Sequence, residues 1–233
     1  MAAVKAVGGP FLGFPQAGVS WFRALAMAQN REWFQANRAG YEQLWLAPMQ
    51  ALLAEVAAPL SRVYGKKLGP PKMFRLNRDV RFSKDKSPYK TNIAGMLPFE
   101  GYAPMEGPAA LYLHLGLEDV VAFGFYALEP DALKRLRTRI VDEKTGAPLQ
   151  KLMTAAQKKG LAPDSMEALK RAPVGVDPEH PRIGLLKHKG LALSCEKIPP
   201  KVRFSKALKP WLLELAKAAA PVVEWGFKNK LVG

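Results

Sequence analysis

The chain has 233 residues, of which 48% are hydrophobic and 24% are charged, a composition typical of a globular protein. Lysine and arginine number 35 against 20 acidic residues, so the formal charge of +15 favours anionic partners such as nucleic acid. The single cysteine, Cys195, excludes an internal disulfide and a cysteine cluster for zinc, and it fits a reducing compartment.

The N-terminal segment 1–18 is mildly apolar but is broken by glycines and prolines. It lacks a continuous hydrophobic stretch of the length that a signal peptide or a membrane span needs. We therefore expect a cytoplasmic protein that has no membrane-spanning segment. Because no linker-like tract interrupts the apolar pattern, we also expect one domain over 1–233, with an ordered core from about 13 to 225.

The first third of the chain predicts helices. Apolar residues recur at helical spacing over 19–26, and Asn30 can cap a second helix. A long amphipathic stripe covers 41–63. A kink or restart is expected at Pro48, and the helix is expected to end at Gly65.

The middle third predicts strands. Short apolar runs separated by turn-rich loops cover 74–82, 93–99, 110–117 and 120–128. Because short consecutive strands with brief connections pair most simply with their neighbours in sequence, we expect a mainly antiparallel sheet.

Helices return in the last third, first with Pro130 in a first turn and then over 148–159. An irregular proline-rich stretch runs to Pro181, a strand lies near Leu191, and a final helix covers about 210–225. This order predicts the α+β class, with a mainly antiparallel central sheet packed by N-terminal and C-terminal helices.

The predicted strand 74–82 carries an unusual polar face. Side chains alternate between the two faces of a strand, so one face collects Arg75, Asn77, Asp79, Arg81 and Ser83. Both Arg75 and Arg81 can reach Asp79 on that face, while Arg78 points the other way. Arginine is suited to two-pronged recognition of carboxylate or phosphate.

A lysine-rich loop follows this strand. It adds Lys84, Lys86 and Lys90, together with Tyr89, whose ring can stack on a base. We therefore expect a binding protein for a phosphate-bearing anionic ligand, a nucleic acid or a nucleotide-like molecule. A second basic stretch at 134–139 supports this. The predicted binding residues are Arg75, Arg78, Arg81, Lys84, Lys86 and Lys90.

Two other functions stay open for the same segment. An enzyme that acts on a phosphorylated or otherwise anionic substrate would use Asp79 or Asp85 as a base and Tyr89 or Lys90 as a donor. A structural or interaction protein without a ligand would use Asp79 only to neutralise its arginine neighbours.

Asp177, Glu179 and His180 form the tightest cluster of acids and histidine. They are candidate metal ligands, but the flanking Pro178 and Pro181 equally suit an ordered turn before a helix. The sequence has no phosphate-binding loop, dinucleotide-binding glycine motif or nucleophile elbow, so no cofactor is indicated. The oligomeric state is not indicated either.

The pentapeptide Val-Arg-Phe-Ser-Lys occurs twice, at 80–84 and 202–206. The flanking sequences differ, and the second copy leads into a predicted helix. We interpret the repeat as coincidence or a shared local need, and not as a domain duplication.

The stretch Asn30-Arg-Glu-Trp-Phe34 and the run from Arg78 to Lys90 resemble the family known as domain of unknown function 2461. Later matches follow at 169–173, 177–181 and 185–187, and the resemblance covers about 13 to 213. It implies a single-domain α+β protein with no assigned activity. Some members have a second Asn before the first motif, where this chain has Gln29.

Overall fold

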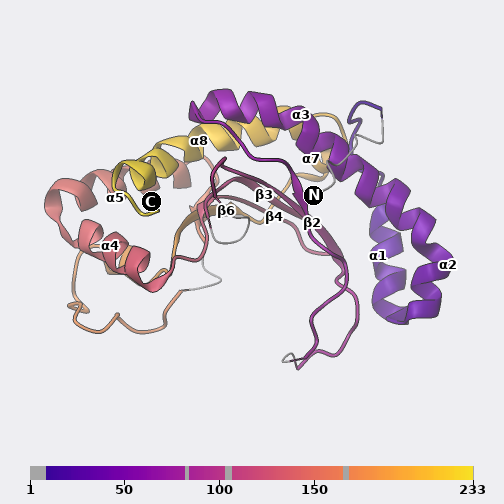
Figure 1. Cartoon of the computed structure of the whole chain (residues 1–233), viewed down its shortest axis with the longest axis horizontal. Coiled ribbons are helices and arrows are strands. Elements are labelled where there is room, and N and C mark those ends of the chain that lie inside the picture. The colour runs from indigo at the N-terminus through magenta and orange to yellow at the C-terminus, as the bar shows by residue number, and fades with distance from the viewer. Residues whose placement is uncertain (1–8, 82–83, 103–106, 165–167, 233) are drawn as a thin grey trace.

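The computed structural model describes residues 9–81, 84–102, 107–164 and 168–232. At its centre lies a six-stranded antiparallel sheet with the strand order β1-β2-β3-β4-β6-β5 (Figure 1). The strands are β1 (Lys72–Met73), β2 (Asn92–Pro98), β3 (Ala109–Gly116), β4 (Val120–Phe125), β5 (Ala162–Pro163) and β6 (Leu191–Cys195). The predicted α+β class and its antiparallel sheet are confirmed.

The N-terminal helices are α1 (Ala17–Ala28), α2 (Arg31–Tyr41), a π-helical turn η1 (Glu42–Leu46) and α3 (Ala47–Tyr64). Asn30 caps α2 as predicted, since its side chain accepts a hydrogen bond from the Trp33 backbone N–H at 2.8 Å. The predicted restart is also confirmed: Pro48 lies in the first turn of α3, where its missing N–H costs no hydrogen bond. Gly65 ends α3 in the left-handed conformation, at φ 59°.

The C-terminal helices are α4 (Pro130–Val141), α5 (Glu143–Gln157), α6 (Ile183–Leu186), α7 (Pro200–Arg203) and α8 (Leu208–Lys228). The predicted start of α5 at Pro148 was wrong. Asp142 caps the helix earlier by accepting a hydrogen bond from the Lys144 N–H at 2.7 Å.

The predicted strand over 74–82 was wrong as well. β1 ends at Met73, and the chain then leaves the sheet as a hairpin, held by backbone hydrogen bonds from Arg78 to Pro88 and from Lys90 to Leu76, each 2.9 Å long. Only an isolated bridge joins Asn77 and Tyr89. We call residues 75–90 the basic hairpin.

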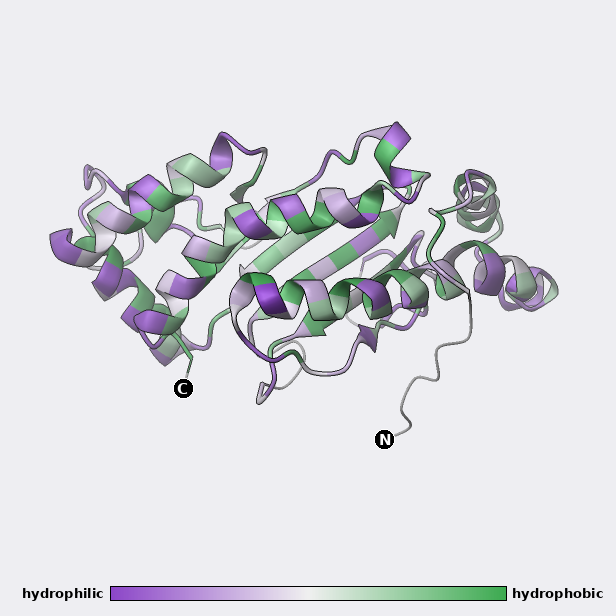
Figure 2. Ribbon diagram, turned by 90° about the horizontal axis from the view of Figure 1, so that it is seen from above, coloured by the Kyte–Doolittle hydropathy of each residue, from purple (hydrophilic) through white to green (hydrophobic). Residues whose placement is uncertain are grey.

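One face of the sheet packs against α3 and α8, which contact each other across it (Figure 2). Alternate strand residues form this buried layer: Leu111, Leu113, Leu115, Val121, Phe123, Phe125, Leu191 and Leu193. Gly95 lets α3 approach β2 closely, because a Cβ there would lie 2.7 Å from Leu53 Cδ1. A groove between α3 and α8, lined by Pro59 and Pro221 among others, lies on the far side from the basic hairpin.

The opposite face of the sheet is concave, and no helix of the described ranges lies across it (Figure 1). Helices α1 and α2 stand at one end of this arch and α4 and α5 at the other. The basic hairpin extends away from the sheet at the end of the arch where α1 and α2 lie. The strand pairing therefore places its residues next to a sheet face that no described helix covers, although Ala94, Met96, Ala122 and Ser194 on this face are buried.

A continuous helical stretch, Arg31–Tyr64, is long and apolar enough by length and composition to cross a membrane. Core helices of soluble proteins pass the same test. Here Trp45, Leu52 and Val56 from this stretch are fully buried in the hydrophobic core. Packing against the sheet accounts for its apolar character.

Candidate functional site

The basic hairpin is fastened to the junction between α1 and α2 through Gln29. This residue has a left-handed backbone with φ 43° and ψ 40°. Its side-chain amide forms two hydrogen bonds with the Tyr89 backbone: it accepts from the N–H at 3.1 Å and donates to the carbonyl at 3.2 Å. These bonds fix where the hairpin leaves the body of the protein.

The Tyr89 ring faces inward. It is 4% exposed and stacks on Phe34, with 4.7 Å between the ring centroids. A ring held in this way has no free face for a base, and it does not reach the surface as a donor would. The structure therefore does not support the predicted stacking or catalytic roles of Tyr89, and the ring serves as a hydrophobic anchor.

At the hairpin tip, Asp79 forms ion pairs with two neighbouring arginines. Arg81 donates two side-chain hydrogen bonds to it at 2.7 and 2.9 Å, and Arg75 lies 3.9 Å away. The hydrogen bonds from Arg81 are the main reason that the pKa of Asp79 is lowered. A carboxylate with a lowered pKa is a weak proton acceptor, so this geometry favours an ion-pair role over a base.

Asp85 is also engaged within the tip. It accepts hydrogen bonds from the Ser87 N–H and hydroxyl and from Arg78, and the Ser87 bonds are the leading cause of its lowered pKa. Lys86 Nζ donates to the Val80 carbonyl at 2.9 Å. Lys84 is exposed at the same tip, and Ser83 lies outside the described residues.

The hairpin base, which we define as Arg75, Arg78 and Lys90, differs from the tip. Arg78 Nε donates to the Tyr89 carbonyl at 3.1 Å, which holds the guanidinium beside Lys90. Burial lowers the pKa of Lys90, and the charges of Arg75 and Arg78 lower it further. Among the described residues, no carboxylate lies within ion-pair distance of Lys90. The structure thus gathers three of the six predicted binding residues and leaves Arg81, Lys84 and Lys86 at the tip.

Sequence reasoning missed His114, which lies near Lys90. His114 is half-buried on β3, and its Nε2 atom is buried without a hydrogen-bond partner in the described structure. Burial lowers its pKa, the Glu118 charge raises it and Lys90 lowers it again. The alternation in β3 carried a signal: Tyr112 and His114 fall between the buried leucines, so both belong on the opposite face.

The candidate metal ligands form a turn instead. Asp177 Oδ1 accepts a hydrogen bond from the Glu179 N–H at 2.9 Å, and His180 Nδ1 accepts from the Arg182 N–H at 3.1 Å. Within the described ranges, no group of three or more His, Cys, Asp or Glu residues is placed to hold a metal ion. The turn leads into α6, as the flanking prolines suggested.

The second basic stretch has a partly structural role. Arg135 donates to the carbonyls of Lys230 and Leu231, and Arg137 donates to the Leu186 carbonyl. These bonds join α4 to the C-terminal segment and to α6. The guanidinium groups of this stretch are therefore less available to a ligand than the hairpin base.

A buried ion pair was also missed. Arg203 Nη1 lies 3.0 Å from Asp119 Oδ2, and the side chains are 12% and 10% exposed. Arg203 also donates to the Gly116 carbonyl at 2.7 Å, while Asp119 accepts from the Gly116 N–H at 3.1 Å. This pair fastens the turn between β3 and β4 to α7.

Comparison with curated proteins finds no match to the chain. The sequence model of the family described as "conserved hypothetical protein (DUF2461)" matches residues 17–225, which include α1, the basic hairpin and the whole sheet. The protein therefore belongs to the DUF2461 family.

Proposed function

We propose that the protein binds a phosphate-bearing anionic ligand at the hairpin base. The observation that carries this proposal is that Arg78, held by the Tyr89 carbonyl at 3.1 Å, and Arg75 act on Lys90, which has no described carboxylate beside it although the two arginines pair with Asp85 and Asp79. Like charges held together in a partly buried place disfavour one another. A phosphate bound among them would offset that repulsion.

The three cations have complementary properties for this task. The Arg75 side chain is 70% exposed and can turn toward a ligand, whereas Arg78 is 32% exposed and is already held by Asp85 and by the Tyr89 carbonyl. A guanidinium can bind two phosphate oxygens at once, and a lysine ammonium adds a compact charge. The formal charge of +15 supports attraction of such anions from a distance in the cytoplasm, where we expect the protein to act.

The engaged carboxylates favour binding over catalysis. Asp79 and Asp85, the two candidate bases, both hold hydrogen bonds inside the hairpin, and both have lowered pKa values. The described part of the hairpin therefore has cations that can bind an anion, but neither Asp79 nor Asp85 is available as a general base.

The test is a titration with inorganic tripolyphosphate, followed by calorimetry at several salt concentrations. Lys90→Gln removes a charge at the hairpin base, and Lys228→Gln removes one on α8, where Lys228 pairs with Glu224. We expect the affinity for tripolyphosphate to fall as salt rises. Lys90→Gln should lower this affinity by about tenfold, and Lys228→Gln should leave it unchanged. Equal affinities for wild type and Lys90→Gln would refute the site.

A further inference from the structure

The face of the sheet opposite α3 and α8 is lined mainly by small side chains. The strand register aligns Met96, Tyr112, Ala122, Ser194 and Ala162 in one row across β2, β3, β4, β6 and β5. A neighbouring row aligns Ala94, His114 and Val120. Ala94, Met96, Ala122 and Ser194 are buried, whereas Tyr112, His114 and Val120 are half-buried and Ala162 is exposed, so the surface that a ligand can reach lies around Tyr112. We call this surface the open face.

An aromatic pair stands on the open face. Phe74 and Tyr112 meet edge to face, with 5.8 Å between the ring centroids and 76° between the ring planes. Both side chains are half-buried, and neither is part of the hydrophobic core that joins the sheet to the helices. An edge-to-face contact covers one face of only one ring, so this pair leaves aromatic surface for a further flat ring.

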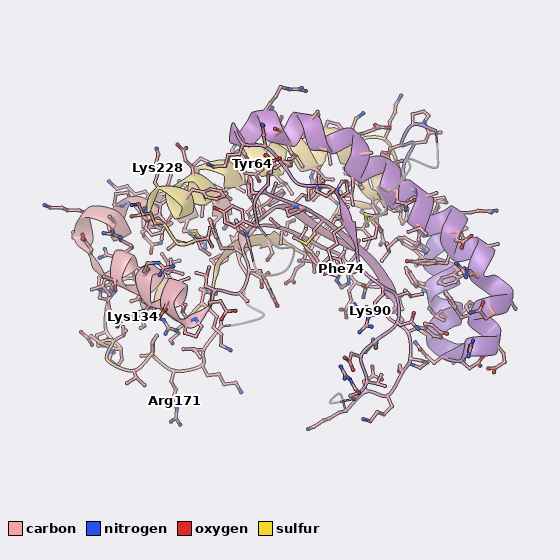
Figure 3. All side chains as sticks on the ribbon, viewed as in Figure 1. Tyr64, Phe74, Lys90, Lys134, Arg171 and Lys228 are labelled. Carbon is pink, nitrogen blue, oxygen red and sulfur yellow. The ribbon has the colours of Figure 1, made fainter. Side chains whose placement is uncertain are left out.

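Cations and a hydrogen-bonding group adjoin this aromatic pair. Lys72 Nζ lies 5.7 Å from the centre of the Phe74 ring. Phe74 and Lys90 both lie on the concave side of the sheet, near where the hairpin leaves it (Figure 3). His114 follows Tyr112 on the same face, and its buried Nε2 atom has no partner in the part of the chain that the structure describes. An aromatic surface, an unused polar nitrogen and phosphate-binding cations are thus neighbours.

We propose that the open face binds single-stranded nucleic acid, with a base on the Phe74–Tyr112 pair and the adjoining phosphate on the hairpin base. This inference rests on the proposed function and adds the identity of the ligand. Bases of a single strand are free to stack on aromatic side chains of an open sheet, whereas a duplex hides them.

A second set of cations favours a strand over a single nucleotide. The segment between β5 and β6, which includes α6, borders the other end of the arch and carries Lys170, Arg171 and Lys187 as well as the acids Asp177 and Glu179. Arg171 lies in this segment, across the concavity from the hairpin (Figure 3). A strand crossing the open face passes from one basic flank to the other, while a mononucleotide reaches only one.

The experiment compares a labelled oligothymidylate of about twelve nucleotides with an abasic oligonucleotide of equal length, by fluorescence anisotropy. Both probes carry the same phosphates, so their difference measures the contribution of the bases. The protein variants are Phe74→Leu, which removes the ring but keeps an apolar side chain, Phe74→Trp, which restores a ring, and Lys90→Gln. Lys228→Gln is the distant charge control, and thermal unfolding checks that each variant is folded.

We expect wild type to prefer the base-containing strand by about tenfold. Phe74→Leu should abolish this preference while abasic binding stays salt-dependent, and Phe74→Trp should restore it. Lys90→Gln should weaken both probes by the same factor. If wild type binds the two probes equally, the base-stacking proposal is refuted, whereas the proposed anion site is not.

Two further results would refute the choice of ligand or the proposed anion site. A mononucleotide or a duplex that binds as tightly as the single strand overturns the choice of ligand and again leaves the anion site intact. If neither oligonucleotide nor tripolyphosphate binds at low salt, the proposed function fails together with this inference.

Discussion

The same five residues, Val-Arg-Phe-Ser-Lys, begin at Val80 and at Val202, and their arginines have opposite surroundings. Arg81 pairs with Asp79 on the surface, where the two side chains are 76% and 41% exposed. Arg203 pairs with Asp119 inside the protein, where the exposed fractions are 12% and 10%. Identical local sequence thus gives a solvated ion pair in one place and a buried one in the other, because tertiary packing decides the burial.

The comparison extends to the hairpin base. Arg203 is compensated from within by the Asp119 carboxylate and the Gly116 carbonyl. Lys90 is also partly buried, yet the nearby charges that act on it are those of Arg75 and Arg78. One region supplies its own counter-charge, and in the other we propose that a ligand supplies it. The predictions below test this difference, in order of decreasing effect on stability.

The largest effect is expected from Arg203→Met, which leaves the buried Asp119 carboxylate without its partner. Removing one member of a buried pair costs about 3–5 kcal/mol of unfolding free energy. Chemical denaturation of wild type and variant measures this loss. Adding Asp119→Leu should recover most of it, and a single variant as stable as wild type would contradict the buried-pair account.

The unfolding free energy lost in Arg203→Met should also depend on pH. Burial raises the pKa of Asp119 even in the presence of Arg203, and loss of the guanidinium raises it further. A raised carboxyl pKa favours folding at low pH, and that contribution is lost as pH rises through the folded-state pKa. The deficit should therefore be greatest at pH 7 and shrink as pH falls toward the unfolded value of about 3.9. A deficit that stays constant over this range would count against an unpaired carboxylate.

A smaller loss is expected from Gln29→Ala, which removes both hydrogen bonds to the Tyr89 backbone. We expect a cost of about 1–2 kcal/mol, because two partly buried backbone groups lose their partner. Hydrogen exchange should quicken at the Arg78 and Lys90 amides, which pair across the hairpin. Gln29→Asn tests whether a shorter side-chain amide still reaches the Tyr89 backbone. Unchanged exchange in Gln29→Ala would refute the anchoring role of Gln29.

Lys90→Gln should increase stability slightly at neutral pH while it weakens anion binding. The lowered pKa of Lys90 means that the charged form is disfavoured in the folded state. A lysine with a depressed pKa reduces stability below that pKa, and the reduction disappears as pH rises through it. Thermal unfolding at pH 7 and at pH 10.5 checks this: the gain should shrink at the higher pH. A loss of stability in Lys90→Gln would instead indicate a structural role.

The smallest effect is expected from Arg81→Met, the surface counterpart of Arg203→Met. Exposed ion pairs contribute little because water and salt screen them. The midpoint of chemical denaturation should not change measurably. If Arg81→Met destabilised the protein as much as Arg203→Met, burial would not be what distinguishes the two copies.

Local signals predicted much of the fold from sequence. Helical periodicity and the Asn30 cap located α1 to α3, and short apolar runs between turn-rich loops located β2, β3 and β4. The strand prediction over 74–82 failed because alternation is the same in a sheet strand and in a hairpin that has left the sheet. β5 was missed because two residues ending in Pro163 carry no periodic signal.

The candidate site was predictable in composition but not in arrangement. Sequence identified the arginines and lysines of 75–90 but not which ones the tip carboxylates engage. The proximity of Lys90 to His114 and the burial of Tyr89 depend on contacts between distant segments, such as the Gln29 anchor. Alternation alone places Tyr112 and His114 on one face, but only the three-dimensional arrangement shows that no helix crosses it.

The most direct measurement is the pKa of Lys90 itself, followed by NMR of protein labelled at the lysine ε-carbons. In the free protein, the pKa of Lys90 should lie below the usual lysine value of about 10.4. Tripolyphosphate bound at the hairpin base should raise the pKa of Lys90. A saturating anion that leaves the pKa of Lys90 unchanged would contradict the account.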